Sequence, residues 1–215
     1  MGCKRNVTLS RTRRLSGTVK QRPIFYYISE GSCSEPDYIQ NIEHIYTRVK
    51  FQMIQRIHHD PKKLLNKMKT FIKSNFPQEN DKFIILLDRD EWLVDDIKRI
   101  WTWEKEDLVH RMVIFSNPCF ELWLLRHYTS GVGATRHDIC HAKLVQKNPK
   151  LNGKSIPVDT FERKHCLQAC QFSKEYSSKN WEEPGFTNGE RLIELLEELC
   201  GFSSKHLKSS EPSPS

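Results

Sequence analysis

The stretch FIILLDRDEW, residues 83–92, changes abruptly from apolar to acidic residues and decides the expected fold. Its first five residues are all apolar, as in a central strand of a parallel sheet that is buried on both faces. Asp88, Asp90 and Glu91 then follow within four positions. Ligands of open α/β sheets bind just beyond the carboxyl ends of the strands. The stretch therefore predicts a buried strand that ends in a functional acidic turn.

Strand and helix patterns alternate on both sides of this stretch. Short apolar or alternating runs predict strands at 24–29, 49–57, 82–88 and 110–116. Apolar residues at helical spacing predict helices that begin at Ser34, Asp60 and Asn117 as N-cap residues, and a further helix at 93–108. Repeated strand–helix units indicate an α/β fold with a parallel sheet flanked by helices.

The pattern changes beyond residue 130. The segments 135–147, 158–176 and 189–200 are helical in character, with no strong strand between them. We therefore expect four parts: a basic, flexible N-terminal arm at 1–22, an α/β core at 23–130, a helical C-terminal part at 131–202 packed on the core, and a disordered Ser/Pro-rich tail at 203–215.

Composition narrows the class of protein. The chain has 215 residues, of which 37% are hydrophobic and 28% charged, as in a soluble globular protein. No apolar run reaches membrane-spanning length, and the N-terminus has no apolar segment of a secretory signal. We expect a cytoplasmic protein without a membrane partner, whose seven cysteines are reduced thiols.

The positive charge is concentrated in the N-terminal arm. The net charge is +7, and residues 1–22 hold seven of the 34 Lys and Arg residues but no acid. Such arms bind nucleic-acid phosphates. A solvated tail that aids solubility is an equally compatible interpretation, and an organelle transit peptide is a third, less favoured one. The candidate phosphate-binding residues are Arg11, Arg13, Arg14, Lys20 and Arg22.

A second acidic residue, Glu30, follows the strand at 24–29. If this strand neighbours the one at 82–88, Glu30, Asp88 and Asp90 converge, and their carboxylates repel unless a cation binds them. Mg²⁺, or Mn²⁺, fits a set of carboxylates, with Glu91 or Glu121 as a supporting or second-metal ligand. In the alternative interpretation, these acids only cap helices and favour their first turns.

Four motifs together resemble the RloB family, also called RloB-like or AbiLii-type proteins. They are ISEGSCSEPDYI, FIILLDRDE, FSNPCFELWLLRHY and PGFTNGERLIELLEEL, in family order from about residue 22 to 200. The resemblance implies a TOPRIM-like core in which Glu30, Asp88 and Asp90 coordinate Mg²⁺. It also implies a role in prokaryotic antiviral defence or abortive infection beside an ABC- or AAA-type ATPase. The family turn resembles EGEKTEP, whereas this chain has EGSCSEP and lacks its lysine.

The expected function is Mg²⁺-dependent hydrolysis of nucleic-acid phosphodiesters, in DNA or in tRNA or other RNA. Glu30 would act as metal ligand or as general base, and Asp88 and Asp90 as metal ligands. The alternative is a non-catalytic, metal- or nucleotide-binding regulator of a defence ATPase. The sequence contains no G-x-x-x-x-G-K-[ST] motif, so ATP hydrolysis would belong to another chain.

Two further hypotheses rank lower. A phosphatase with Asp88 as covalent nucleophile is disfavoured, because such enzymes place this aspartate near the start of the chain and follow it with Thr or Val. A zinc site in the helical part would need ligand spacings that the sequence lacks, which favours packing cysteines. Its candidate ligands are His137, Cys140, His141, His165, Cys166 and Cys170.

Overall fold

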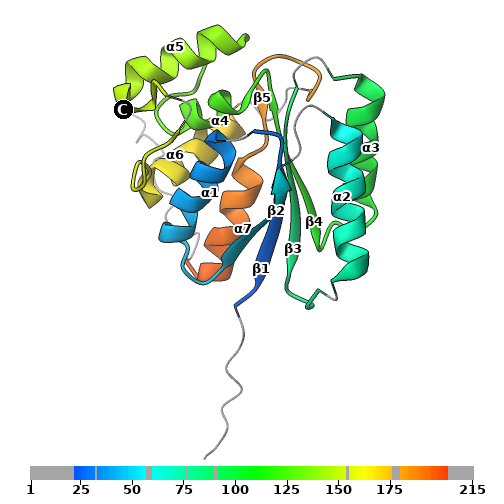
Figure 1. Ribbon diagram of the computed structural model, residues 1–215. Helices are drawn as coiled ribbons and strands as arrows, with labels where there is room; N and C mark the ends of the chain where they lie inside the picture. Colours follow the sequence, from blue (N-terminus) through cyan, green and yellow to red (C-terminus); the bar gives the residue numbers. More distant parts are fainter. Residues whose placement is uncertain are drawn as a thin grey trace, which may run out of the picture.

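A five-stranded sheet with the order β2-β1-β3-β4-β5 forms the centre of the protein (Figure 1). The computed structural model describes residues 22–31, 33–56, 60–75, 77–89, 92–153, 155–175 and 180–202. The parallel strands are β1 (Ile24–Ser29), β2 (Lys50–Arg56), β3 (Lys82–Asp88) and β4 (Arg111–Asn117). The short β5 (Phe186–Thr187) pairs antiparallel with β4. The expected α/β fold with a largely parallel sheet is confirmed.

Helices cover both faces of the sheet (Figure 1). One face carries α2 (Pro61–Ser74) and α3 (Val94–Lys105). The other face carries α1 (Ser34–Ile45), α4 (Phe120–Arg126), α5 (His137–Lys147), α6 (Arg163–Lys174) and α7 (Glu190–Cys200), with the short 3₁₀ helix η1 (Pro149–Leu151) after α5. Within the described ranges, no helix is both long and apolar enough to cross a membrane.

The two faces explain why β3 is uniformly apolar. Ile84 and Leu86 pack into the cluster beneath α1, α4, α6 and α7, whereas Ile85 and Leu87 pack into the cluster beneath α2 and α3. Successive side chains of a strand point to opposite faces, so a strand covered on both sides needs apolar residues at every position. The pattern at 83–87 therefore reports a strand buried on both faces.

The expected helix starts differ in accuracy. Asp60 caps α2 as predicted, since its side chain accepts a hydrogen bond from the backbone N–H of Lys63 at 3.1 Å. Ser34 as N-cap is wrong by one position, because Ser34 is already helical and Cys33 occupies the cap position. Asn117 and Pro118 do not begin α4 either: Asn117 is the last residue of β4, and Cys119 is the N-cap.

The helical character of the C-terminal part is confirmed, and its described residues also contain the two-residue strand β5. β5 lies between α6 and α7 and adds the fifth strand to the sheet. Two residues are too few for a recognisable sequence pattern. Asn188 extends the pairing with its side chain, which accepts from Phe115 N–H at 2.7 Å and donates to the Val113 carbonyl at 2.9 Å. A buried amide side chain thus substitutes for strand backbone along β4.

Replacing Asn188 with alanine should destabilise the protein. The buried Phe115 N–H and Val113 carbonyl would each lose this partner, so we expect the free energy of unfolding to fall by about 2 to 4 kcal/mol. Urea denaturation followed by circular dichroism measures it. Asn152→Ala, at an exposed asparagine, is the control and should change stability by less than about 0.5 kcal/mol. Equal stability of the two variants would contradict the role given to Asn188.

Candidate functional site

Glu30 lies directly beyond β1 and is almost fully buried, with 7% of its surface exposed. Its Oε2 accepts a hydrogen bond from the indole Nε1–H of Trp92 at 3.1 Å. Trp92 belongs to the loop between β3 and α3, where the Arg89 guanidinium donates to its carbonyl at 2.6 Å. The acidic turn after β3 and the acidic residue after β1 are therefore joined by direct contacts.

The turn after Glu30 is closed by Glu35, a residue that the sequence did not single out. The Glu35 Oε1 accepts from the Gly31 N–H at 3.0 Å, and Glu35 is buried. A Cβ atom on Gly31 would lie 1.8 Å from Glu35 Oε2, so a larger residue would have to displace this carboxylate. The EG pair of the family motif thus has a steric reason, and Glu35 has a structural role.

Asp88 is the last residue of β3 and pairs in register with Ser116 of β4. It continues the alternation of Ile84 and Leu86, which face α1 and α4. Its charge acts on Cys119, whose thiol lies on that same side of the sheet. Asp90 and Glu91, the other acidic residues of the predicted turn, lie outside the described residues.

The passage from β4 to α4 positions Glu121. Asn117 stays in the strand because β5 pairs with it and because its side chain donates to the Trp181 carbonyl at 3.0 Å. The peptide bond between Asn117 and Pro118 is cis. Cys119 then takes the cap position in extended conformation, and Glu121 lies in the first turn of α4 with 20% of its side chain exposed. The expected N-cap at Asn117 was wrong because tertiary pairing with β5 outweighs the local Asn-Pro signal.

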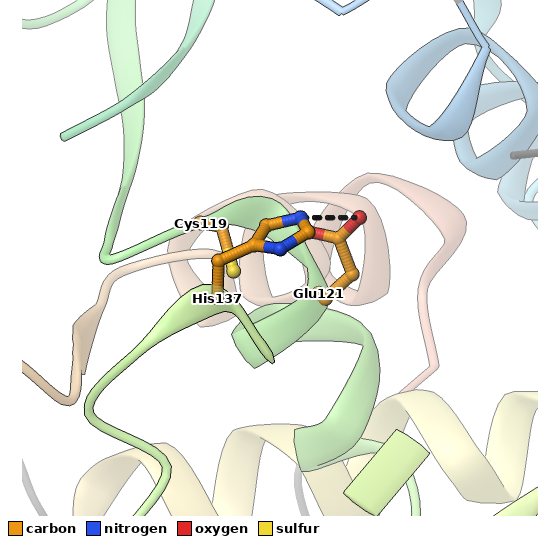
Figure 2. A group of neighbouring side chains, drawn as sticks. All are labelled: Cys119, Glu121 and His137. Atoms are coloured by element: carbon orange, nitrogen blue, oxygen red, sulfur yellow. Dashed lines mark ion pairs between the residues drawn. The ribbon is translucent and has the colours of Figure 1, made fainter. Parts of the chain in front are cut away.

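Glu121 faces two residues that sequence reasoning did not connect with it. The His137 Nε2 lies 3.8 Å from Glu121 Oε1, and the Cys119 thiol lies beside both (Figure 2). Among the described residues, these three side chains form a group of His, Cys and Glu residues that could hold a metal ion. Their ligand atoms all lie within 4.8 Å of one another. Glu30 and Asp88 are not members of this group.

The Cys119 thiol lies in an environment that disfavours its anion. A hydrogen bond with the Cys140 thiol, burial, and the negative charges of Glu121 and Asp88 all raise the pKa of Cys119. The effects of Glu121 and Asp88 on the pKa of Cys119 show that these three residues are electrostatic neighbours near the ends of β3 and β4.

The other zinc candidates of the sequence are not members of this group of three, although Cys140 and His141 lie next to it. Cys140, Cys166 and Cys170 are buried among apolar residues, as expected of packing cysteines. His165 accepts a hydrogen bond from the Glu162 N–H at 3.1 Å and so belongs to the capping box of α6. The rings of His137 and His141 stack with their centroids 6.4 Å apart.

The parallel strands β1, β3 and β4 end on the same side of the sheet. Glu30 lies just after β1, Asp88 is the last residue of β3, and Glu121 lies in the first turn of the helix that follows β4. Their oxygens are the hard donors that Mg²⁺ prefers, so the residues fit a magnesium ion. Glu30 reaches toward Trp92, on the side of α2 and α3, whereas Asp88 leans toward α4. Glu30 and Asp88 would be the residues to hold such an ion. In the described part of the chain they do not form, together with Glu121, a group whose ligand atoms all lie within 4.8 Å of one another.

The basic arm lies mostly outside the described residues. Arg11, Arg13, Arg14 and Lys20 belong to that part of the chain, and Arg22 is exposed just before β1. Because Arg22 precedes β1 and Glu30 follows it, the two residues lie at opposite ends of this strand.

One family model matches the sequence over residues 25–196, and its description is RloB-like protein. No curated protein and no solved structure matches the chain. The matched range begins within β1 and contains β2 to β5, together with Glu30, Asp88 and Glu121. It covers well over half of the chain, and the protein therefore belongs to the RloB-like family.

Proposed function

We propose that the protein is a Mg²⁺-dependent nuclease that hydrolyses phosphodiesters of DNA or of tRNA and other RNA. Mn²⁺ would serve as an alternative ion. The observation that carries this proposal is the placement of three acids on the side where the parallel strands end: Glu30 just after β1, Asp88 as the last residue of β3, and Glu121 in the first turn of α4 after β4. This side is where open α/β folds bind ligands.

Each acidic residue has a role in the proposed reaction. Asp88 and Asp90 hold the ion, and Glu91 or Glu121 supports it; Asp90 and Glu91 are assigned from the sequence alone. When bound, the cation stabilises negative charge on the phosphoryl and leaving oxygens. Glu30 accepts the proton of the attacking water as general base, or contributes an oxygen ligand. The hydrogen bond from Trp92 fixes the direction of the Glu30 carboxylate.

The basic arm supplies affinity that does not depend on sequence. Arg11, Arg13, Arg14, Lys20 and Arg22 would contact phosphates of the substrate. Their charge also draws a polyanion toward a protein whose remaining residues carry balanced charge.

Family membership supports a defence setting for this activity. We infer a role in prokaryotic antiviral defence, such as abortive infection, with a partner ATPase of the ABC or AAA type. The sequence lacks a P-loop motif, so the partner would supply ATP hydrolysis. This setting also accommodates a non-catalytic regulator of the same ATPase, which the following experiment separates from a nuclease.

The double substitution Glu30→Ala and Asp88→Ala should abolish cleavage. Loss of a general base and of a metal ligand should lower the rate by at least about 100-fold. The rate is measured with purified protein, Mg²⁺ or Mn²⁺, and labelled DNA or tRNA. Asp95→Ala, at an exposed acid in the first turn of α3, is the matched control and should cleave like the unaltered protein.

Two results would overturn this assignment. Unchanged cleavage by the double variant would show that the acidic edge is not the catalytic site. Binding of Mg²⁺ without cleavage of any nucleic acid, even with the partner ATPase and ATP present, would favour the regulator instead.

Neutralising the arm should weaken binding without changing its sequence preference. Each phosphate contact contributes roughly 0.9 to the slope of log affinity against log salt concentration. Alanine at Arg11, Arg13, Arg14, Lys20 and Arg22 should therefore flatten this slope by up to about 4 to 5. Fluorescence anisotropy over a salt series measures it. An unchanged slope would assign the arm to solubility.

A further inference from the structure

Three side chains with different donor atoms meet where α4 and α5 begin. Cys119 is the N-cap residue of α4, Glu121 lies in its first turn, and His137 is the first residue of α5. Figure 2 shows the Glu121 carboxylate and the His137 ring directed toward each other, with the Cys119 sulfur beside them. All three ligand atoms lie within 4.8 Å of one another, and the His137–Glu121 pair is at 3.8 Å.

We infer that Cys119, Glu121 and His137 form a binding site for a zinc ion. The site differs from the magnesium site proposed above in its donors and does not depend on it. Glu121 is the one residue named for both sites. With Glu121 at the zinc ion, Glu91 is the supporting ligand that remains for magnesium beside Glu30, Asp88 and Asp90.

The donor set selects zinc over magnesium. Zinc combines thiolate, imidazole and carboxylate ligands, whereas magnesium takes oxygen ligands almost alone. Zinc–sulfur bonds of about 2.3 Å and zinc–nitrogen bonds of about 2.0 Å place neighbouring ligand atoms roughly 3.5 Å apart. Side-chain rotations of the exposed His137 and of Glu121 can close the present separations to that value. Three protein ligands leave the fourth position of a tetrahedral zinc ion to water or to a ligand.

The three candidate ligands differ in burial. Cys119 is 3% exposed, whereas the side chains of Glu121 and His137 are 20% and 68% exposed. The His137 and Glu121 side chains are therefore the ligands within reach of an ion from solvent. Binding replaces the thiol proton by zinc: the S–H bond breaks, a Zn–S bond forms, and the proton leaves to solvent.

The surrounding charges favour a cation. Glu121 and Asp88 both exert negative potential on Cys119. Arg136, the residue before His137, directs its guanidinium to Asp138, with an N–O distance of 2.9 Å. The positive charge nearest to His137 in the sequence is thus engaged by a carboxylate of α5.

A plain ion pair is the competing explanation for the contact between His137 and Glu121. The chain offers a matched comparison, since His44 and Asp159 also form a histidine–carboxylate pair at 3.7 Å on the surface. What distinguishes the candidate site is the thiol of Cys119 beside the pair. The two pairs therefore separate zinc binding from ordinary surface electrostatics.

The test measures zinc affinity of the full chain after removal of bound metal by a chelator. Zinc is titrated in competition with a chromophoric chelator, in the unaltered protein and in His137→Ala, Cys119→Ser and His44→Ala. We expect the unaltered protein to bind one zinc ion per chain. His137→Ala and Cys119→Ser should lower the zinc affinity at least about 100-fold, because loss of a direct ligand exceeds the tenfold to 100-fold effect of losing an outer group. His44→Ala should leave the zinc affinity unchanged. Cobalt(II) substitution should add a thiolate-to-cobalt charge-transfer band that Cys119→Ser removes.

His137 is exposed, so His137→Ala should fold normally and keeps the test valid even if the buried Cys119→Ser variant does not. Equal zinc affinity of His137→Ala and the unaltered protein would overturn the proposal, as would a cobalt spectrum without the thiolate band. Since Glu30 and Asp88 are intact in all of these variants, magnesium-dependent cleavage can fail while zinc binding succeeds, and the reverse.

Discussion

The parallel direction of β1, β3 and β4 is the constraint on which the rest of the molecule depends. Parallel strands end on the same side of the sheet, so Glu30 and Asp88 lie at the ends of paired strands although 58 positions separate them in the chain, with their side chains on opposite faces. The cost of gathering carboxylates is offset by contacts made at the same edge. Trp92 donates to Glu30, and Glu35 is held by the Gly31 N–H. Glu30 is therefore held in place by contacts from the neighbouring strand connection and is more than an isolated helix cap.

Most of the core could be predicted because its signals are local. Apolar runs bounded by glycine, proline or acids marked β1 to β4, and Asp60–Pro61 marked the start of α2. The errors arose where distant residues decide the structure. Asn117 remains in β4 because β5 and Trp181 hold it there, and β5 itself is too short to show a pattern. Nothing in the residues around Asn117 carries this information.

The candidate site divides in the same way. Glu30, Asp88 and Glu121 were found from the sequence because each follows a strand, which is a local property. Cys119 and His137 meet only because α5 packs back onto α4 after the intervening loop, and no spacing rule relates them. The resulting edge offers two kinds of donor. Carboxylates lie at the ends of β1 and β3, and a thiol with an imidazole lies beyond β4, so the two proposed sites would separate hard and softer cations by position.

The hydrogen bonds from the Asn188 side chain to β4 have a consequence for folding during translation. The amide that holds Phe115 is encoded 73 residues later, so a nascent chain on the ribosome exposes the outer edge of β4 until that segment has emerged. The strand that orients Cys119 and Glu121 thus receives its final support late in translation. The side of the sheet that carries Glu30, Asp88 and Glu121 would thereby be completed only after most of the sequence has left the exit tunnel.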